Sequence, residues 1–280
     1  MFLKVILNDF KNKGFFNYIL RVKRGLRIQI NVMRALTYRE FIGRASLVKF
    51  GYLGILIEPL GVMAIFLTIF TLIRRRGGNE DLGVLLFLIC GIVIFTLFQA
   101  IAIRSMNSMD ANSSLFFYRQ VHPIDTIFSR TIVEIVIYSV VFMILVTIAF
   151  LIKESFFISD FALLIGSFIS IAVTSMGLGI FLMIATYRYE WVKSIVQFLM
   201  RPIWFLSGVF FSLNDIPQNI RPYLSWNPIL QSIELLRHSF ANSYTLSEEI
   251  SLTYLIQSTL VVLAISLWLY DKNHRILRTK

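Results

Sequence analysis

The chain has 280 residues, of which 57% are hydrophobic and 15% are charged. Soluble domains usually carry about a quarter charged residues, so this composition excludes an ordinary soluble globular protein and indicates a polytopic membrane protein. The formal net charge of +11 also raises nucleic-acid binding as an alternative. The cations gather beside apolar runs, however, and this placement argues for a membrane surface and against nucleic acid.

The first 50 residues are strongly basic. They hold eleven of the 27 basic residues, against two acids, Asp9 and Glu40. Positive charge next to membrane spans keeps a segment in the cytoplasm. From Gly25 to Lys49, apolar residues and arginines are mixed, which predicts an amphipathic helix along the lipid headgroups. We therefore expect a cytoplasmic and interfacial segment over 1–50, with a solvated linker as the alternative.

Six apolar runs are long enough to cross a bilayer, which needs about 20 residues of helix. The runs without any charged residue are 82–103, 161–187 and 251–270, and the others are 51–73, 131–152 and 191–211. We expect an all-α polytopic membrane protein with six transmembrane helices per chain. The transmembrane domain covers 51–270, and a cytoplasmic tail covers 271–280.

Six crossings place both termini in the cytoplasm, together with the loops around 104–130 and 188–193. By this topology 21 basic residues lie on the cytoplasmic side and six on the other. The bias agrees with the positive-inside rule. Arg74, Arg75 and Arg76 are an exception, because they fall in an outer loop.

The loop after the second predicted span is long and has a polar part followed by an aromatic part, RSMNSMDANSSLFFYRQVHPID over 104–125. A loop of this length between spans usually has a function. Asp125 is placed to cap the next helix, and Arg130 and Glu134 lie one turn apart on it.

The fifth predicted span ends in RPIWFLSGVFFSLNDIP, 201–217. Pro202 and the small pair Ser207 and Gly208 predict a bend and a close approach to a neighbouring helix. A charged residue within a span is costly, so Arg201 is expected to reach the interface or to face a polar interior.

The segment 212–240 is too apolar for a free loop, and its prolines at 217, 222 and 228 prevent it from crossing the bilayer. Non-helical backbone at membrane depth survives only when protein covers it or it faces water. We expect a re-entrant pair of short helices at the outer face. Asn227 followed by Pro228 is a good helix start. Glu234 and Arg237 lie one turn apart, and a local ion pair and a gate or substrate role both stay open.

Motifs for enzymatic chemistry are absent from the sequence. There is no G-x-x-x-x-G-K-[ST] for nucleotide phosphates and no G-x-S-x-G. His122, His238 and His274 are far apart and Cys90 is the only cysteine, so no metal site is expected within one chain. A membrane-embedded enzyme that uses lipid substrates stays an alternative without a supporting motif, as does a basic membrane scaffold.

Three segments resemble the permease subunits of ABC-2-type exporters. The segment YREFIGRASLVKFGYLGILIEPL, 38–60, resembles the entry to their first span, with a glycine at Gly54 where the family commonly has tryptophan. The segments 115–134 and 201–237 resemble the branch that exports capsular polysaccharide. The matching residues are Arg39, Glu40, Arg44, Gly51, Tyr52, Leu53, Glu58, Pro59, Val121, Pro123, Asp125, Arg130, Glu134, Pro202, Ser207, Gly208, Pro217, Asn227, Pro228, Glu234 and Arg237.

The resemblance implies a transport subunit without its own ATPase site, which moves lipid-linked capsular polysaccharide across the bacterial inner membrane. Such a permease pairs with a second copy of itself and with two ATP-binding subunits, which hold ATP and Mg. A periplasmic polysaccharide co-polymerase or export protein is a further expected partner. Alternative substrates are O-antigen, teichoic acid or a drug.

The resemblance also implies residues for coupling to the ATPase, in the N-terminal helix and the 104–126 loop: Arg39, Glu40, Asn107, Asp110, Leu115, Tyr118 and Arg119. Aromatic side chains stack on sugar rings, and the candidates for the substrate path are Tyr52, Trp204, Phe205, Phe210, Phe211 and Trp226. Lipid-facing aromatics are the alternative for each. The gate or structural candidates are Glu58, Pro59, Pro202, Ser207, Gly208, Asn227, Pro228, Glu234 and Arg237.

Overall fold

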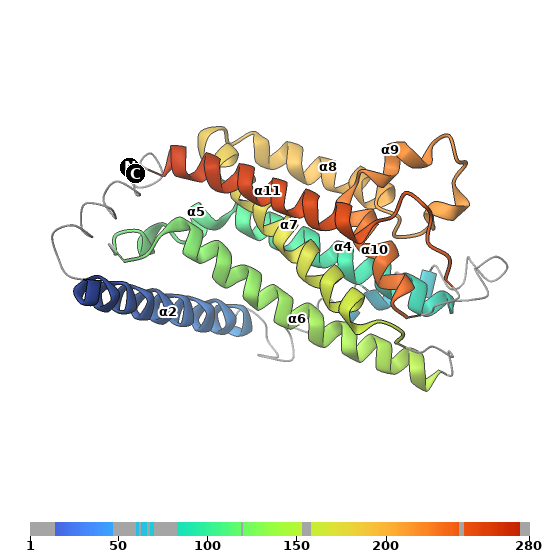
Figure 1. Ribbon diagram of the computed structural model, residues 1–280, viewed down its shortest axis with the longest axis horizontal. Helices are drawn as coiled ribbons and strands as arrows, with labels where there is room; N and C mark the ends of the chain where they lie inside the picture. The colour runs from blue at the N-terminus through green and yellow to red at the C-terminus, as the bar shows by residue number, and fades with distance from the viewer. Residues whose placement is uncertain are drawn as a thin grey trace.

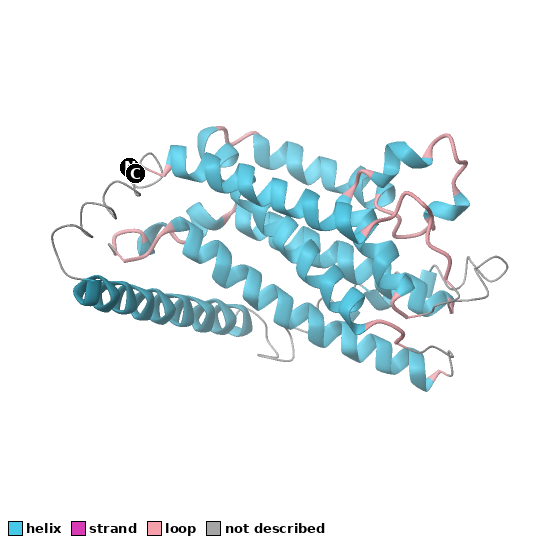
Figure 2. Ribbon diagram, in the orientation of Figure 1, coloured by secondary structure: helices cyan, strands magenta, loops and turns pink. Residues whose placement is uncertain are grey.

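The structure is a computed structural model that describes residues 15–46, 60–61, 63–65, 68–69, 83–118, 120–152, 158–240 and 244–274. Every regular element in these ranges is a helix (Figure 2). Four helices are long and apolar enough to cross a membrane: α4 (Val84–Met106), α6 (Pro123–Leu151), α7 (Phe161–Arg188) and α11 (Leu252–Asn273). The prediction of an all-α polytopic protein is confirmed. Most of the predicted span 51–73, including Tyr52, Glu58 and Pro59, lies outside the described residues.

α8 (Val192–Leu206) differs from the predicted span 191–211. It has 15 residues and ends just before Ser207, so it rises about 22 Å, less than the roughly 30 Å of a bilayer core. Gly208 has φ +70°, a left-handed conformation that glycine adopts without the steric cost that other residues have. The helix therefore ends five residues earlier than predicted, at the small pair, and Pro202 lies within it.

α4 is the central helix of the bundle (Figure 1). It packs against α6, α7 and α10 (Pro228–His238), and residues 86–95 are buried on all sides. Apolar composition alone does not set this position, because lipid chains are as apolar as the protein interior, and the apolar helix α11 is mostly exposed. α7 also packs along α11. Gly177 of α7 permits this contact, since a Cβ there would lie 3.1 Å from Val262 Cγ1.

One end of the bundle gathers α2 (Phe15–Ser46), the loop after α4 and the last turn of α11 (Figure 1). That loop contains α5 (Ser108–Ala111) and the turn η1 (Ser113–Leu115). The opposite end carries the segment between α8 and α11. This arrangement agrees with a topology in which the N-terminal helix, the 104–126 loop and the tail share one side. The cytoplasmic assignment of that side stays a prediction.

The segment after α8 contains two short α-helices, as predicted. A turn of 3-10 helix, η2 (Leu213–Asp215), leads to α9 (Arg221–Ser225) and then to α10. Residues 229–237 of α10 are buried, mainly against α4 and α7. The depth of this pair in the membrane stays a prediction.

Gly91 of α4 packs against the backbone of Val209, which follows α8. We expect Gly91→Ala to lower the free energy of unfolding by about 1–3 kcal/mol, because an added Cβ overpacks this contact. It would lie 2.7 Å from the carbonyl oxygen of Val209 and 3.0 Å from its Cα, and backbone atoms cannot yield alone. Gly166→Ala is the matched control, since a Cβ there meets nothing within 4 Å. Thermal unfolding in detergent measures both, and equal melting temperatures for the two variants would contradict the close packing.

Candidate functional site

Five charged side chains join α2 to the bundle, and we call them the α2 network: Glu40, Arg44, Arg104, Arg130 and Glu134. The Glu40 carboxylate from α2 lies 3.2 Å from Arg130 Nε on α6 and 3.4 Å from Arg104 Nη1 on α4. One acid on α2 therefore contacts both neighbouring membrane helices.

Glu134 completes this network from α6. Its side chain is fully buried, and its two oxygens lie 3.1 Å from Arg44 Nη1 on α2 and 3.1 Å from Arg104 Nε on α4. Arg130 Nη1 also donates a hydrogen bond to the carbonyl of Arg104 at 2.5 Å. A buried carboxylate is stable only when charged or hydrogen-bonding partners compensate it. The pairing thus fixes α2, α4 and α6 relative to one another.

Further contacts hold the loop after α4 against α2. Arg39 donates a hydrogen bond to the side-chain oxygen of Asn112. Gln29 Nε2 donates to Asp125 Oδ1 at 2.6 Å, and Asp125 Oδ2 accepts from the backbone N–H of His122 at 2.9 Å. Asp125 takes part in the cap, as predicted, but from the third position of α6: His122 is the N-cap residue, and Asp125 is its partner in a capping box.

The other coupling candidates lie along the same loop. Asn107 ends α4 and donates to the carbonyl of Ile103 at 3.0 Å. Asp110 pairs with Lys193 of α8 at 2.5 Å. Leu115 ends η1, and Tyr118 is 67% exposed beside Phe117, which is 86% exposed. Arg119 lies outside the described residues.

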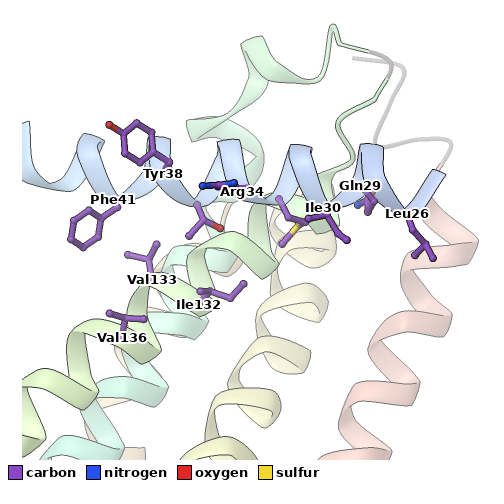
Figure 3. A pocket seen from close by; sticks show the side chains of 11 residues that line it. Leu26, Gln29, Ile30, Arg34, Tyr38, Phe41, Ile132, Val133 and Val136 are labelled. Carbon is purple, nitrogen blue, oxygen red and sulfur yellow. The ribbon is translucent and has the colours of Figure 1, made fainter. Parts of the chain in front are cut away.

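A groove of about 570 Å³ separates α2 from α6 (Figure 3). Ile132, Val133 and Val136 of α6 form one wall, and the facing surface of α2 forms the other. Leu26, Gln29, Ile30, Met33, Arg34, Thr37, Tyr38 and Phe41 line it from α2. Its apolar walls suit acyl chains, whereas the α2 network beside it is polar.

A second cavity, of about 350 Å³, lies between α4 and α8, and we call it the α4–α8 cavity. Its lining residues recur every three or four positions on each helix, so each helix presents one face. They are Ile92, Phe95, Thr96, Gln99 and Ile103 of α4 and Gln197, Met200, Arg201 and Trp204 of α8. Arg201 lines this open cavity and its side chain is exposed, so whether it reaches the interface or faces a polar interior stays a prediction.

Three of the aromatic candidates for the substrate path gather beside this cavity. The ring of Trp204 lies 5.2 Å from that of Phe205 and 4.6 Å from that of Phe210, both edge to face. Two other candidates lie elsewhere. Phe211 packs against a separate small core, and Trp226 is exposed, with its carbonyl accepting from the Tyr254 hydroxyl at 2.7 Å.

Residues 207–212, between the end of α8 and η2, are not helical, and we call them the break. Contacts from α10 hold the break in place. Asn227 caps α10 by accepting from the N–H of Ile229 at 3.0 Å, as predicted, and Pro228 is the first residue of the helix. The other end of its amide donates to Ser207 Oγ at 3.2 Å, and Ser207 donates to the carbonyl of Ile203 at 2.6 Å. One side chain thus joins the start of α10 to the end of α8.

Arg237 satisfies the carbonyls that the break leaves without helical partners. It donates to Val209 O at 2.9 Å and to Phe211 O at 3.1 Å. It also donates to Phe87 O of α4 at 3.3 Å, and it pairs with Glu234 at 3.0 Å. Neither charged side chain has an exposed surface of more than 1%. This geometry favours the local ion pair over direct contact with substrate.

Tyr244 and Ser212 supply further partners of Glu234, and the Ser212 hydroxyl lies 3.4 Å from Glu234 Oε2. The Tyr244 hydroxyl lies 2.9 Å from Glu234 Oε2 and 2.9 Å from Ser212 Oγ. Burial raises the pKa of the Tyr244 hydroxyl, so it stays protonated and can donate to the carboxylate. Both oxygens of Glu234 are therefore occupied.

Several residues of these sites were not among the sequence-based candidates. Asn112, Arg104 and Lys193 contact coupling candidates, and Gln99 and Gln197 line the α4–α8 cavity. The ion pairs of the α2 network join residues 30 to 90 positions apart. A polar residue within an apolar run was the available signal for both glutamines.

Comparison with known proteins agrees with this architecture. The ABC-2 type transporter family matches residues 31–241. The polysialic acid transport protein KpsM of Escherichia coli is 34% identical over 92% of this chain and 99% of its own length. Two capsule polysaccharide export inner-membrane proteins are also similar: BexB of Haemophilus influenzae, 26% identical over 88% of this chain and 92% of its own, and CtrC of Neisseria meningitidis serogroup A, 27% identical over 86% and 91%. The chain belongs to the ABC-2 type transporter family.

Proposed function

We propose that this chain is the permease subunit of an ATP-driven exporter that moves lipid-linked capsular polysaccharide across the bacterial inner membrane. The observation that carries this function is the similarity, over nearly the whole chain, to three proteins named for capsule or polysialic acid transport. The α4–α8 cavity supports it, because a partly polar cavity between membrane helices can admit sugar hydroxyls.

ATP hydrolysis belongs to two separate subunits in this proposal, which hold ATP and Mg. The α2 network supports the coupling, because it fixes α2 to α4 and α6 through ion pairs. A force applied to α2 or to the exposed Phe117 and Tyr118 then moves these membrane helices. Arg39, Glu40 and Asp110 keep their proposed coupling roles, because they lie on α2 and on the loop after α4, at the same end of the bundle.

A second copy of the chain completes the conduit in this proposal. α8 presents Ile195, Phe198, Leu199, Phe205 and Leu206 as exposed apolar side chains. The outer surface at α9 meets a periplasmic co-polymerase or export protein. At the cytoplasmic end, acyl chains of membrane lipids enter the groove between α2 and α6 (Figure 3), with Arg34 at the headgroup level.

Deletion of the gene from an encapsulated strain tests the function. We expect surface capsule to disappear, glycan to accumulate inside the cell, and a plasmid copy to restore export. Normal capsule in the deletion strain contradicts the proposal. If surface O-antigen, teichoic acid or drug efflux fails while capsule stays normal, the chain is an exporter of that other substrate.

We expect Trp204→Ala and Phe210→Ala each to reduce surface capsule several-fold at equal permease levels, because the aromatic faces beside the cavity stack on sugar rings. Trp268→Ala is the matched control, since Trp268 is exposed on α11. Quantifying capsule per cell measures the effect. Unchanged capsule in both cavity variants removes these residues from the substrate path.

A further inference from the structure

Arg201 is the one charged side chain among the described residues that line the α4–α8 cavity. It lies nine residues after Val192, the first residue of α8, which is about 13 Å along the helix. A cation at such a depth is unfavourable unless it contacts water, a counter-ion or a ligand. The Arg201 side chain is exposed along this cavity, so water reaches it and a ligand in the cavity can contact it.

Arg201 also lacks the partners that other arginines of the bundle have. Arg237 and Arg130 each contact a carboxylate and backbone carbonyls. No hydrogen bond or ion pair joins Arg201 to another described residue, and no described acid lines the cavity. The guanidinium is thus available to a ligand.

Gln99 and Gln197 supply polar groups near the same depth. Gln99 lies seven residues before the end of α4, and Gln197 lies five residues after the start of α8. The two ends are neighbours, because Lys193 pairs with Asp110 just after α4. The two helices run antiparallel (Figure 1), so both carboxamides and Arg201 fall about 8–13 Å inside that end. Trp204 lies one turn further along α8, on the same cavity wall.

We propose that this cavity binds an anionic group of the exported glycan, a carboxylate on a sugar or a phosphate of the linkage or lipid carrier. This inference rests on the proposed function. Arg201 forms the charge-assisted hydrogen bonds, since a guanidinium matches the two oxygens of either group. The carboxamides of Gln99 and Gln197 bond neighbouring hydroxyls, and the Trp204 ring packs on a sugar face. The cavity therefore selects an acidic glycan over a neutral one.

Binding to the purified permease, with its ATP-binding subunits in lipid nanodiscs, tests the proposal. The probes are oligosaccharides from the strain's own capsule, the same oligosaccharides after carboxyl reduction, and inorganic phosphate as a competitor. We expect Arg201→Gln to weaken binding of the native oligosaccharide about tenfold or more. Arg201→Lys is expected to weaken it less, because lysine keeps the charge but loses the paired hydrogen bonds of the guanidinium. Lys272→Gln, outside the cavity on α11, is the control.

The two sources of the anion give different results. If carboxyl reduction weakens binding as much as Arg201→Gln does, the site recognises a sugar carboxylate. If reduction has no effect and inorganic phosphate competes only when Arg201 is present, it recognises a phosphate. Gln99→Glu keeps Arg201 but adds a carboxylate to the cavity, which competes with an anionic ligand for the arginine. We therefore expect this variant to weaken binding too. It serves as the test if Arg201→Gln does not fold.

Wild-type binding and export in both Arg201→Gln and Gln99→Glu overturns this inference. In that case the proposed function stands as long as the deletion strain lacks surface capsule. Normal capsule in the deletion strain contradicts the proposed function itself, whatever the cavity binds.

Discussion

Arg237→Gln is expected to lower the free energy of unfolding by about 3–5 kcal/mol, because it removes one partner of a fully buried ion pair. The substitution also leaves the carbonyls of Val209 and Phe211 without their donor. Buried carbonyls without a hydrogen bond are destabilising. We therefore expect little folded permease in the membrane, and thermal unfolding of the purified chain is the measurement.

The charge-reversed pair, Glu234→Arg with Arg237→Glu, separates two explanations of this effect. It restores an ion pair but not the three backbone acceptors of the arginine, so we expect no recovery. Full recovery means that the pair alone matters and that the acceptors contribute little. Arg188→Gln, at the exposed end of α7, is the control, and a change within about 0.5 kcal/mol is expected there.

Glu134→Gln is expected to abolish most capsule export. The carboxylate is the shared partner of Arg44 and Arg104, and its loss leaves two cations facing each other across α2 and α4. Breaking a buried pair costs about 3–5 kcal/mol, an upper bound here because Arg44 and Arg104 retain contact with solvent. We expect the variant to fold and α2 to detach from the bundle.

Two measurements follow Glu134→Gln: surface capsule, and a disulfide between cysteines placed on α2 and α6. Loss of export together with slower cross-linking agrees with a detached α2. Asp271→Asn is the control, because Asp271 lies at the exposed end of α11. Normal export and unchanged cross-linking in Glu134→Gln contradict a coupling role for the network.

The features that the sequence predicted correctly depend on local chemistry. The helices α4, α7 and α11 follow from uncharged apolar runs, and the start of α10 follows from Asn227 and Pro228. The capping contact of Asp125 joins residues three positions apart. The end of α8 was wrong by five residues, because apolar residues continue to 211 while the backbone turns at Gly208.

The features that the sequence did not predict depend on how distant segments meet. Nothing in the sequence indicates that Glu40 contacts Arg104 and Arg130, since the pattern of charges permits many pairings. The carbonyl acceptors of Arg237 exist only because the break lies over α4. The aromatic candidates divided in the same way, with Trp204 beside the cavity and Trp226 exposed at the outer end.

Transport in a reconstituted system tests the central claim most directly. The permease and its ATP-binding subunits are placed in vesicles that carry labelled lipid-linked capsular glycan on the outer leaflet, with the ATP-binding subunits facing outward. The account predicts that the glycan becomes protected inside the vesicle only when ATP, Mg and this chain are all present. Equal protection in vesicles without this chain, or turnover of the glycan by this chain alone, contradicts it.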